Sequence, residues 1–491
     1  MEIIKTYSDS ESKKLDEYTI HQFGIEGKTL MGLASVSIFQ EYSSLWKDYE
    51  IIILCGSGNN GGDGLALGYF LFQSGFEIKI FRKSGQHSEE YTFYLRLLQK
   101  SNCEISNLDE ASDYILSCKY GTFLIVDAML GIGFKPPLND YYTNLVNTIN
   151  TFRKMNPNSR ILSIDCASGF FPCSNIHYIK PDFLAEVGVV KTNSIYYRYE
   201  LSHYSFHPIG FPVKEFENLN SEIGGHSCFV PSSWGEIQKI TKRESDSHKY
   251  TNGSATFIGG SNGMSGAIMI SQNAFHVLGG GISKVFTPSR TTLEILLKTD
   301  PSMMATDLNK DTVADSFLRK SDVIVIGPGL NPIDLNFPLS YRKEQFVIID
   351  AGSLESVKNK KLNQNFLLTP HIGEFTKLID AKHKHIFDYI PYLKNYCIQN
   401  QVNVLLKSHI SIFGDTTGKV YYWAYPNPRL AVMGSGDLLV GILAFFISRT
   451  KDWITSVNYS LSVLKQTENM EALYPTVNDI KNYIKELIAY A

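Results

Sequence analysis

Apolar and polar positions follow two patterns along this chain, and each pattern predicts one kind of secondary-structure element. Short apolar runs rich in β-branched residues are typical of strands that are buried on both faces of a parallel sheet. Between them lie longer stretches in which apolar residues recur every three or four positions, as on the buried side of a helix. In the first half the predicted elements are a helical arm at 8–42 and strands at 51–55, 76–81, 122–127 and 160–165.

The second half repeats this alternation of strands and helices. The segment ISIFGDTTGKVYYWA is typical of a hairpin that turns at 415–418. Strands that alternate with helical stretches predict a second, mostly parallel sheet with helices on both faces. The predicted strands are 255–258, 282–288, 322–326, 346–350, 366–370 and 402–407.

Between residues 212 and 254 the periodicity fades, and Ser, Asn, Gly and charged residues become frequent. Such a change in composition is typical of the segment between two domains. A chain of 491 residues is also long for a single hydrophobic core. We therefore predict two α/β domains, residues 1–221 and 222–491, joined by a short tether that contains one helix.

Composition and charge narrow the class of protein. Hydrophobic residues make up 43% of the chain and charged residues 19%, and the net charge of −3 offers no basic surface for nucleic acid. The seven cysteines show no C-x-x-C pairing, so we expect reduced thiols. The N-terminal residues are too polar for a signal peptide, and the longest apolar run, 438–447, is shorter than the ~20 residues of a membrane span. We expect a cytoplasmic protein that binds neither nucleic acid nor membrane.

A glycine-dense loop follows the first strand of the N-terminal half. Residues 56–64 read GSGNNGGDG, and an apolar helical stretch comes next. Because glycines let the backbone direct its N–H groups toward an anion at a helix N-terminus, the loop predicts a phosphate-binding turn. Neither the dinucleotide pattern G-x-G-x-x-G nor the P-loop pattern fits it. The alternative is a tight structural connection between strand and helix.

Two later strands of this half end in aspartate. Asp127 is followed by Gly131-x-Gly133, and Asp165 runs into the segment CASG at 166–169. Open α/β sheets bind their ligands at the carboxyl ends of their strands, so both carboxylates are candidate site residues. The alternative role for either is a local cap of the chain.

The chemical centre of the second half is predicted at Gly434-Ser435-Gly436-Asp437, ahead of the apolar stretch LLVGILAFFI. Glycines at the start of a helix expose N–H groups to a transferring phosphoryl group, and a carboxylate beside them can accept the proton of a hydroxyl. Asp437 is therefore the candidate catalytic base of this half.

The motif CGSGNNGGDG resembles the signature of the YjeF N-terminal family, whose enzymatic members epimerise hydrated NADH and NADPH. The resemblance implies a Rossmann-like three-layer sandwich and a potassium ion at Asn60, Asp127 and Ser168. Oxygen ligands suit such a hard cation, which would neutralise a pyrophosphate. Epimerising the hydroxylated carbon requires proton transfer at its hydroxyl, for which Asp165 is the candidate catalytic residue. The implied substrate contacts are Asn59, Asn60, Gly61, Gly62, Asp63, Gly131, Ile132, Gly133, Phe134, Lys135, Pro136, Pro137 and Asp165.

In the second half the segments IGGSNGMSGA, VIGPGL, LLTPHIGEF, VNVLLKS and GSGDLLVG resemble, in order and spacing, the ribokinase-like YjeF C-terminal family. That family comprises ADP- or ATP-dependent dehydratases of hydrated NAD(P)H, with a doubly wound sheet. The resemblance implies ADP or ATP as co-substrate, together with Mg²⁺. The implied nucleotide contacts are Lys407, Ser408, His409, Ile410, Ser411 and Gly436. The implied substrate contacts are Ala267, Gly329, His371 and Asp437.

The chain departs from these family patterns at five positions. In the first half an acidic residue is replaced by Gly32 and a proline by Ala167. In the second half Gly352 stands in place of an aspartate, Ile372 in place of a proline and Ser408 in place of a glycine.

Together the two resemblances imply a bifunctional enzyme that repairs hydrated NADH and NADPH, called NADHX and NADPHX. The first domain would interconvert the R and S epimers at the hydroxylated carbon, and the second would remove water from the S epimer with ADP or ATP. A ribokinase-like kinase of a vitamin alcohol and a non-catalytic nucleotide-binding scaffold are the alternatives, since related folds serve both. We also expect a homo-oligomer. The sequence leaves open which nucleotide and which hydrate are preferred.

Overall fold

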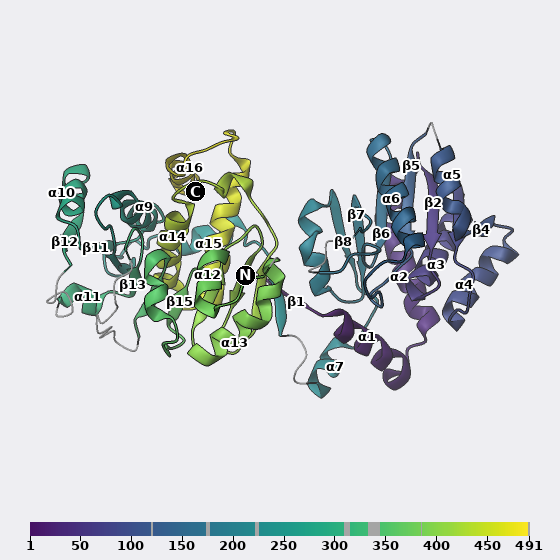
Figure 1. Cartoon of the computed structure of the whole chain (residues 1–491), viewed down its shortest axis with the longest axis horizontal. Coiled ribbons are helices and arrows are strands. Elements are labelled where there is room, and N and C mark those ends of the chain that lie inside the picture. Colours follow the sequence, from purple (N-terminus) through teal and green to yellow (C-terminus); the bar gives the residue numbers. More distant parts are fainter. Residues whose placement is uncertain are drawn as a thin grey trace. The chain divides into compact units, whose positions relative to one another are not determined.

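The computed structural model describes residues 1–118, 121–172, 177–220, 225–308, 315–331, 344–383 and 385–489. The chain separates into two units, Lys5–Gly224 and a second unit made of Met1–Ile4 with Gly225–Ala491. Each unit is built on one mainly parallel sheet with helices, so the predicted two-domain α/β fold class is confirmed (Figure 1). The predicted boundary at residue 222 lies outside the described residues and stays a prediction.

The N-terminal unit contains a seven-stranded parallel sheet in the order β4-β3-β2-β5-β6-β7-β8. Counted from β2, this is the order 3-2-1-4-5-6-7, and it reverses direction between β2 and β5. Such a reversal opens a crevice at the carboxyl ends of the two strands. The strands are β2 (Glu50–Cys55), β3 (Ile78–Arg82), β4 (Ile105–Asn107), β5 (Phe123–Ala128), β6 (Arg160–Ile164), β7 (Phe183–Val187) and β8 (His203–His207).

Helices cover both faces of this sheet, which explains the unbroken apolar runs. Along β2, Ile51 and Ile53 pack in the core with α2, α3 and α4, whereas Ile52 and Leu54 pack in the core with α5 and α6. Figure 1 shows these two groups of helices around the sheet. The helices are α1 (Asp9–Tyr18), α2 (Gly27–Tyr42), α3 (Asn59–Gln73), α4 (Glu89–Lys100), α5 (Ala111–Ser117), α6 (Asp140–Met155) and α7 (Val213–Leu219).

The C-terminal unit contains an eleven-stranded sheet in the order β1-β9-β18-β17-β16-β15-β14-β13-β10-β11-β12. From β12 to β16 the strands are parallel, and β17 and β18 form the predicted antiparallel hairpin. Counted from β10, the parallel part again runs 3-2-1-4-5-6-7. The strands are β1 (Ile3–Thr6), β9 (His226–Phe229), β10 (Ser254–Ile258), β11 (Ile282–Thr287), β12 (Met304–Asp307), β13 (Val323–Ile326), β14 (Phe346–Ile349), β15 (Phe366–Leu368), β16 (Asn403–Leu406), β17 (Ser411–Gly414) and β18 (Val420–Trp423).

The central helix of this unit is α14 (Ser435–Thr450), which contacts β10, β13 and β14 as well as α9 and α15. A Cβ at Gly441 would lie 2.1 Å from the carbonyl oxygen of Ser271, so α9 and α14 touch through their backbones. Residues 438–448 of α14 are all buried, which explains the apolar run LLVGILAFFI. Among the described residues no helix is long and apolar enough to cross a bilayer. The other helices are α8 (Trp234–Thr241), α9 (Ser265–Val277), α10 (Arg290–Thr299), α11 (Ser316–Lys320), α12 (Ile372–Ile379), α13 (Ile390–Asn400), α15 (Trp453–Gln466) and α16 (Val477–Ala489).

The segment between the two halves differs from the predicted short tether with one helix. It contains two helices, α7 and α8, and the strand β9, which pairs with β18 in the large sheet. The first residues of the chain also belong to this region, because the N–H of Val230 donates to the carbonyl oxygen of Glu2 at 3.2 Å. A strand as short as HSCF carries too few apolar residues to show a period, which is why the sequence pattern missed it.

Candidate active sites

The glycine loop after β2 is shaped by close backbone contacts. A Cβ at Gly56 would lie 1.7 Å from the carbonyl oxygen of Met129, and a Cβ at Gly61 would lie 2.1 Å from that of Gly56. At Gly58 a Cβ would meet nothing within 4 Å. The loop is therefore pressed against the turn after β5, and α3 begins there at Asn59. A Cβ at Gly131 would lie 3.2 Å from that of Asn60, so the start of the predicted segment 59–63 meets the start of the predicted turn 131–137.

Asp127 is fully buried at the end of β5. Its carboxylate accepts hydrogen bonds from the Ser168 hydroxyl at 2.5 Å, the Ser168 N–H at 2.9 Å and the Ser163 hydroxyl at 2.8 Å. Burial raises the pKa of Asp127, although these hydrogen bonds oppose the rise. The Leu130 N–H donates to the Ser168 hydroxyl oxygen at 2.8 Å, so the turn after β5 is tied to the same group.

Asn60 has a buried oxygen that lacks a hydrogen-bond partner among the described residues. Its Nδ2 donates to the Leu130 carbonyl oxygen at 3.1 Å, while Oδ1 remains unpaired. Leaving a buried acceptor unpaired costs about 1–3 kcal/mol, which a bound cation would offset. The neighbouring oxygens of Asp127 and Ser168 complete a set of hard oxygen donors. The predicted ligands Asn60, Asp127 and Ser168 therefore fit a potassium ion, although their role stays a prediction.

Asp165 lies directly after β6 with a φ of +65°, and it is ion-paired with Lys191. The two side chains are 16% and 4% exposed, and the carboxylate also accepts from the Val187 N–H at 3.1 Å. Burial disfavours the charge of Lys191, but the carboxylates of Asp165 and Glu186 outweigh it and raise the pKa of Lys191. Sequence reasoning missed Lys191. The available signal was a lysine at the end of the apolar run VGVV, where a buried cation needs a partner.

Asp165 and Lys191 line a small pocket of the N-terminal unit. Its wall also includes Gly131, Ile132 and Phe134, three of the predicted substrate contacts. Gly133, Lys135, Pro136 and Pro137 belong to the same turn but do not line the pocket. Asp63 is half-buried, and burial together with the charge of Asp165 raises its pKa well above the ordinary value. Asn59, Gly61 and Gly62 form the first turn of α3 beside Asn60.

At each of the two positions where this unit departs from the family pattern, Gly32 and Ala167, a tyrosine hydroxyl lies close by. A Cβ at Gly32 would lie 2.5 Å from the Tyr94 hydroxyl oxygen, so the tyrosine fills the space of a longer side chain. The N–H of Ala167 donates to the Tyr197 hydroxyl oxygen at 3.1 Å, and a proline has no N–H to donate. In this chain the two positions thus serve packing and hydrogen bonding.

Asp437 lies in the first turn of α14, after Gly434 with a φ of +90°. Burial and the charge of Asp350 raise the pKa of Asp437 to about 6, while Lys407 opposes the rise. Lys407 pairs with Asp350 at 2.8 Å, and a Cβ at Gly436 would lie 3.5 Å from Lys407 Nζ. Asp437, Asp350 and Lys407 therefore converge at the carboxyl ends of β14 and β16.

Asp350 was not among the predicted site residues. It is buried, follows β14 directly and accepts a hydrogen bond from the Thr369 hydroxyl at 2.7 Å. The signal was present, because an aspartate at the end of a buried strand is also what selected Asp127 and Asp165. Its neighbour Gly352 lies in a short 3-10 turn where the family pattern has an aspartate.

The predicted substrate contacts of the C-terminal unit form two neighbouring groups. His371 caps α12 and lies beside Lys407 in a parallel bridge. Gly329 has a φ of +60°, and a Cβ there would lie 3.1 Å from that of Ala267. The groups are linked because Gly327, two residues before Gly329, packs against the backbone of Asp350. Ala267 and Gly329 follow β10 and β13, between which the strand order reverses, whereas His371 follows β15, farther along the sheet.

The predicted nucleotide contacts after Lys407 differ in exposure. Ser408 is half-buried and its hydroxyl is 3.1 Å from His409 Nδ1, while His409 is exposed. Ile410 is fully buried, which leaves only its backbone for a ligand, and Ser411 is buried at the start of β17. Ile372, where the family pattern has a proline, is the first residue of α12. These contacts stay predictions.

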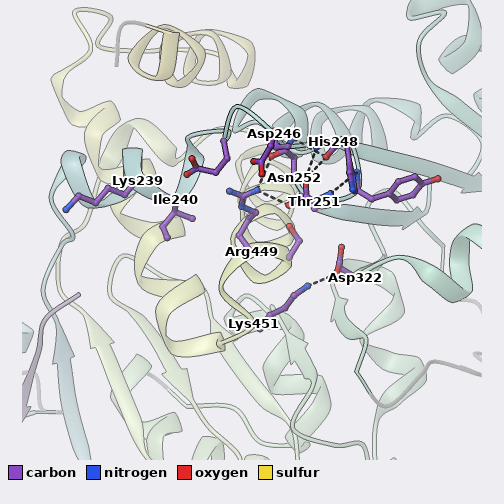
Figure 2. Close-up of a pocket in the computed structure, with 14 residues that line it drawn as sticks. Lys239, Ile240, Asp246, His248, Thr251, Asn252, Asp322, Arg449 and Lys451 are labelled. Carbon is purple, nitrogen blue, oxygen red and sulfur yellow. Dashed lines mark hydrogen bonds and ion pairs between the residues drawn. The ribbon is translucent and has the colours of Figure 1, made fainter.

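A separate hollow of about 590 Å³ lies at the amino ends of β10 and β13, away from Asp350 and Asp437. Figure 2 shows Arg449 and Lys451 in it. Arg449 donates to Thr251 and Asn252 at 3.1 and 3.2 Å, and Lys451 pairs with Asp322 at 2.6 Å. Both cations are thus engaged by the protein: Arg449 anchors the loop before β10, and Lys451 binds Asp322 just before β13.

In a comparison with known proteins, each half of the chain matches a protein family. Residues 27–192 match the family described as the YjeF-related protein N-terminus, and residues 255–472 match the family described as NAD(P)H-hydrate dehydratase. The chain is 28% identical over 479 residues to a Moorella thermoacetica protein named bifunctional NAD(P)H-hydrate repair enzyme Nnr, covering 89% of this chain and 86% of that one. A Dictyoglomus turgidum protein of the same name is 28% identical over 480 residues, covering 90% and 89%.

Among solved structures, the ADP/ATP-dependent NAD(P)H-hydrate dehydratase of Bacillus subtilis, co-crystallised with ATP and Mg²⁺, is 21% identical and has a TM-score of 0.47. The match covers 53% of this chain and 98% of that one. The family resemblances drawn from the motifs are confirmed by the two family matches. The chain thus belongs to the YjeF-related family in its N-terminal half and to the NAD(P)H-hydrate dehydratase family in its C-terminal half.

Proposed function

We propose that the chain is a bifunctional enzyme that repairs hydrated NADH and NADPH. The N-terminal unit interconverts the R and S epimers of the hydrate, and the C-terminal unit dehydrates the S epimer with ADP or ATP. The observation that carries the proposal is that each unit, within its family's segment, gathers charged residues at the carboxyl ends of its parallel strands. In one unit these are Asp165 and Lys191, and in the other Asp350, Lys407 and Asp437.

Dehydration follows from phosphoryl-transfer chemistry, because hydroxide is a poor leaving group and phosphate a good one. Asp437 takes the proton of the ring hydroxyl, whose oxygen attacks the terminal phosphoryl group of the nucleotide. The C–O bond then breaks with push from the ring nitrogen, a proton leaves the adjacent carbon, and phosphate departs. N–H groups at Gly434 and Gly436 stabilise the charge that develops on the phosphoryl oxygens.

Two residues set the electrostatics around Asp437. Asp350 makes Asp437 a better base by repelling its negative charge, which is one reason why its pKa is raised. Lys407 lies between Asp350 and the glycines and provides positive charge beside the phosphoryl group. A bound Mg²⁺ would neutralise the phosphate oxygens of the nucleotide.

Epimerisation uses the same C–O bond without phosphorylation. Push from the ring nitrogen expels the hydroxyl as water once it receives a proton, and water then adds to the other face of the ring. Asp165, fixed by Lys191 and the Val187 N–H, handles a proton in this exchange. Asn60, Asp127 and Ser168 would hold a potassium ion, which supplies positive charge for the substrate pyrophosphate.

A vitamin kinase would need only the C-terminal unit, so the YjeF-related N-terminal unit argues against it. Burying charged groups costs desolvation free energy. A non-catalytic scaffold would have no reason to bear this cost for the ion pair of Asp165 and Lys191 in a pocket.

The test is to incubate the protein with each pure hydrate epimer, with and without ADP or ATP, and to follow the absorbance of the reduced ring. We expect the S epimer to recover with nucleotide and the R epimer to recover after conversion. Without nucleotide, chromatography should show both epimers approaching equilibrium faster than spontaneously. Phosphorylation of a vitamin alcohol without ring recovery would overturn the proposal.

A further inference from the structure

The N-terminal arm contributes a carboxyl group to the pocket of the YjeF-related unit. Among the described residues lining that pocket, Asp9 is the one that comes from α1. The others follow β5, β6 or β7, as ligand-binding residues of such a sheet do. The family match begins at residue 27, so Asp9 lies outside the segment that the family comparison covers.

The structure holds Asp9 in place through several contacts. Tyr7 pairs with Lys191 as a short parallel strand: the Tyr7 N–H donates to Val190 and the Thr192 N–H donates to Tyr7, both at 2.8 Å. The next residue, Ser8, caps α1 in a reciprocal pair with Glu11. These contacts fix the start of the helix on the segment that carries Lys191.

The Asp9 side chain itself is also held. Asn193 Nδ2 donates to Asp9 Oδ2 at 2.7 Å, and both residues line the pocket. One carboxylate oxygen of Asp9 is thereby engaged, and within the described part of the chain no hydrogen bond keeps Oδ1 from a ligand. A carboxyl group positioned in this way can transfer a proton in a defined direction.

The charges in the pocket give the two aspartates different states. Lys191 neutralises Asp165 in a buried ion pair, so Asp9 is the surplus carboxyl group. Burial and the charge of Asp165 raise the pKa of Asp9 to about 6, although Lys191 and Asn193 oppose the rise. The thiol of Cys166 and the hydroxyl of Tyr197 are further titratable groups in the lining of the same pocket. Near neutral pH a fraction of Asp9 thus carries a proton that it can donate.

We propose that Asp9 is a second catalytic residue of the epimerase pocket and works as the partner of Asp165. Epimerisation needs a proton donor for the hydroxyl that leaves one face and an acceptor for the water that adds to the other face. Asp9 donates its proton as the C–O bond breaks and the ring nitrogen forms a C=N bond. Water then attacks the ring carbon, the C=N bond returns its electrons to nitrogen, and Asp165 accepts the proton of the water.

For conversion of the opposite epimer the two aspartates exchange roles. After one turnover Asp9 is ionised and Asp165 protonated, and solvent returns the proton because Asp9 is half-buried. The step consumes no oxidant, reductant or cofactor. The inference rests on the proposed epimerase function, and the following test separates the two.

The test compares Asp9→Asn with Asp16→Asn in the full-length protein. Asparagine at position 9 can still accept the hydrogen bond from Asn193, so it removes the transferable proton and the charge of the ionised form while it keeps this contact. Asp16 is the matched control, because it is on the same helix and senses Asp165 and Lys191 but does not line the pocket. Interconversion of pure R and S NADHX is measured without nucleotide, and thermal unfolding and nucleotide-dependent dehydration serve as folding controls.

We expect Asp9→Asn to slow interconversion by ~10² with little change in KM, and Asp16→Asn to stay within about threefold of the wild type. Asp9→Glu should restore part of the rate, and the wild-type rate should fall above pH 6 in a way that Asp9→Asn lacks. Wild-type interconversion by Asp9→Asn, or an equal loss in Asp16→Asn, would overturn the role of Asp9. If the wild-type protein itself fails to interconvert the epimers, the proposed epimerase function is wrong instead.

Discussion

The two units share a strand order but differ in how they treat the aspartate at the centre of the site. In the N-terminal unit Asp165 is ion-paired with the buried Lys191. In the C-terminal unit the lysine, Lys407, pairs with Asp350, and among the described residues Asp437 has no ion-pair partner. The ion pair with Lys191 holds the Asp165 carboxylate in position, whereas burial and the charge of Asp350 raise the pKa of the unpaired Asp437 to about 6. The same sheet therefore supports two kinds of proton chemistry.

The largest effect that separates the sites is expected from Asp165→Asn. Interconversion of the epimers without nucleotide should be abolished, while nucleotide-dependent dehydration of the S epimer should stay unchanged. Asparagine tolerates the positive φ of this position, so the backbone should hold. The removed charge deprives the buried Lys191 of its ion-pair partner, which costs about 3–5 kcal/mol of stability.

The matched control for that loss of stability is the double variant Asp165→Asn with Lys191→Met. Removing both charges should restore much of the unfolding temperature without restoring interconversion. Interconversion at the wild-type rate in either variant would return Asp165 to the role of a local cap.

The next largest effect is expected from Asp437→Asn. Ring absorbance recovery with ADP or ATP should fall by ~10² or more, because a positioned base is lost, while nucleotide binding measured by calorimetry persists. The control is Asp380→Asn, which removes an exposed carboxylate in the same unit at a position with a φ of +52°. Recovery within a few-fold of the wild type would exclude Asp437 as the base.

The sequence could predict those parts of the two sites that are contiguous along the chain, but not those that long-range pairing brings together. Local features such as the glycine loop, the strand-end aspartates and GSGD are contiguous, so the pattern identified them. Lys191, Asn193 and Asp9 were missed because their function depends on long-range pairing, which here joins Tyr7 to Lys191 across the chain. No residue spacing encodes that contact.

The strands show the same limit. β2, β5 and β6 are continuous apolar runs with both faces buried, and the sequence predicted them. β7 and β8 were missed because they contain polar residues that are satisfied only by tertiary contacts. Glu186 in β7, for example, is fully buried and accepts from Arg198 at 3.0 Å and from the Tyr204 hydroxyl at 2.6 Å. Alternation alone cannot distinguish such a strand from a loop.

A smaller effect is expected from pH, with opposite signs in the two units. Asp437 must be ionised to act as a base, so dehydration should fall about tenfold per pH unit below its pKa of about 6. Asp9 must be protonated to act as an acid, so interconversion should fall above its pKa of about 6. Rates are measured from pH 5 to 8 after subtraction of the spontaneous reactions. If both rates, dehydration and interconversion, fall toward the same end of this pH range, the roles assigned to Asp437 and Asp9 are contradicted.

The smallest effect is expected from potassium, and only in the N-terminal unit. The unpaired Asn60 oxygen gains a partner when the ion binds, so potassium should stabilise the folded unit by RT ln(1 + [L]/Kd), about 2.7 kcal/mol at 100 times Kd. For a unit of this size each kcal/mol corresponds to about 2–4 °C in unfolding temperature. Thermal unfolding is compared in potassium chloride and choline chloride at equal ionic strength.

Asn60→Leu should lose the potassium dependence, because it removes the unpaired oxygen and keeps a side chain of similar size. Gly58→Ala is the control in the same loop, since a Cβ there meets nothing within 4 Å and should leave the dependence intact. The C-terminal unit, whose charged residues Asp350 and Lys407 already pair with each other, should unfold at the same temperature in both salts. An equal potassium shift in Asn60→Leu and the wild type would place the ion elsewhere.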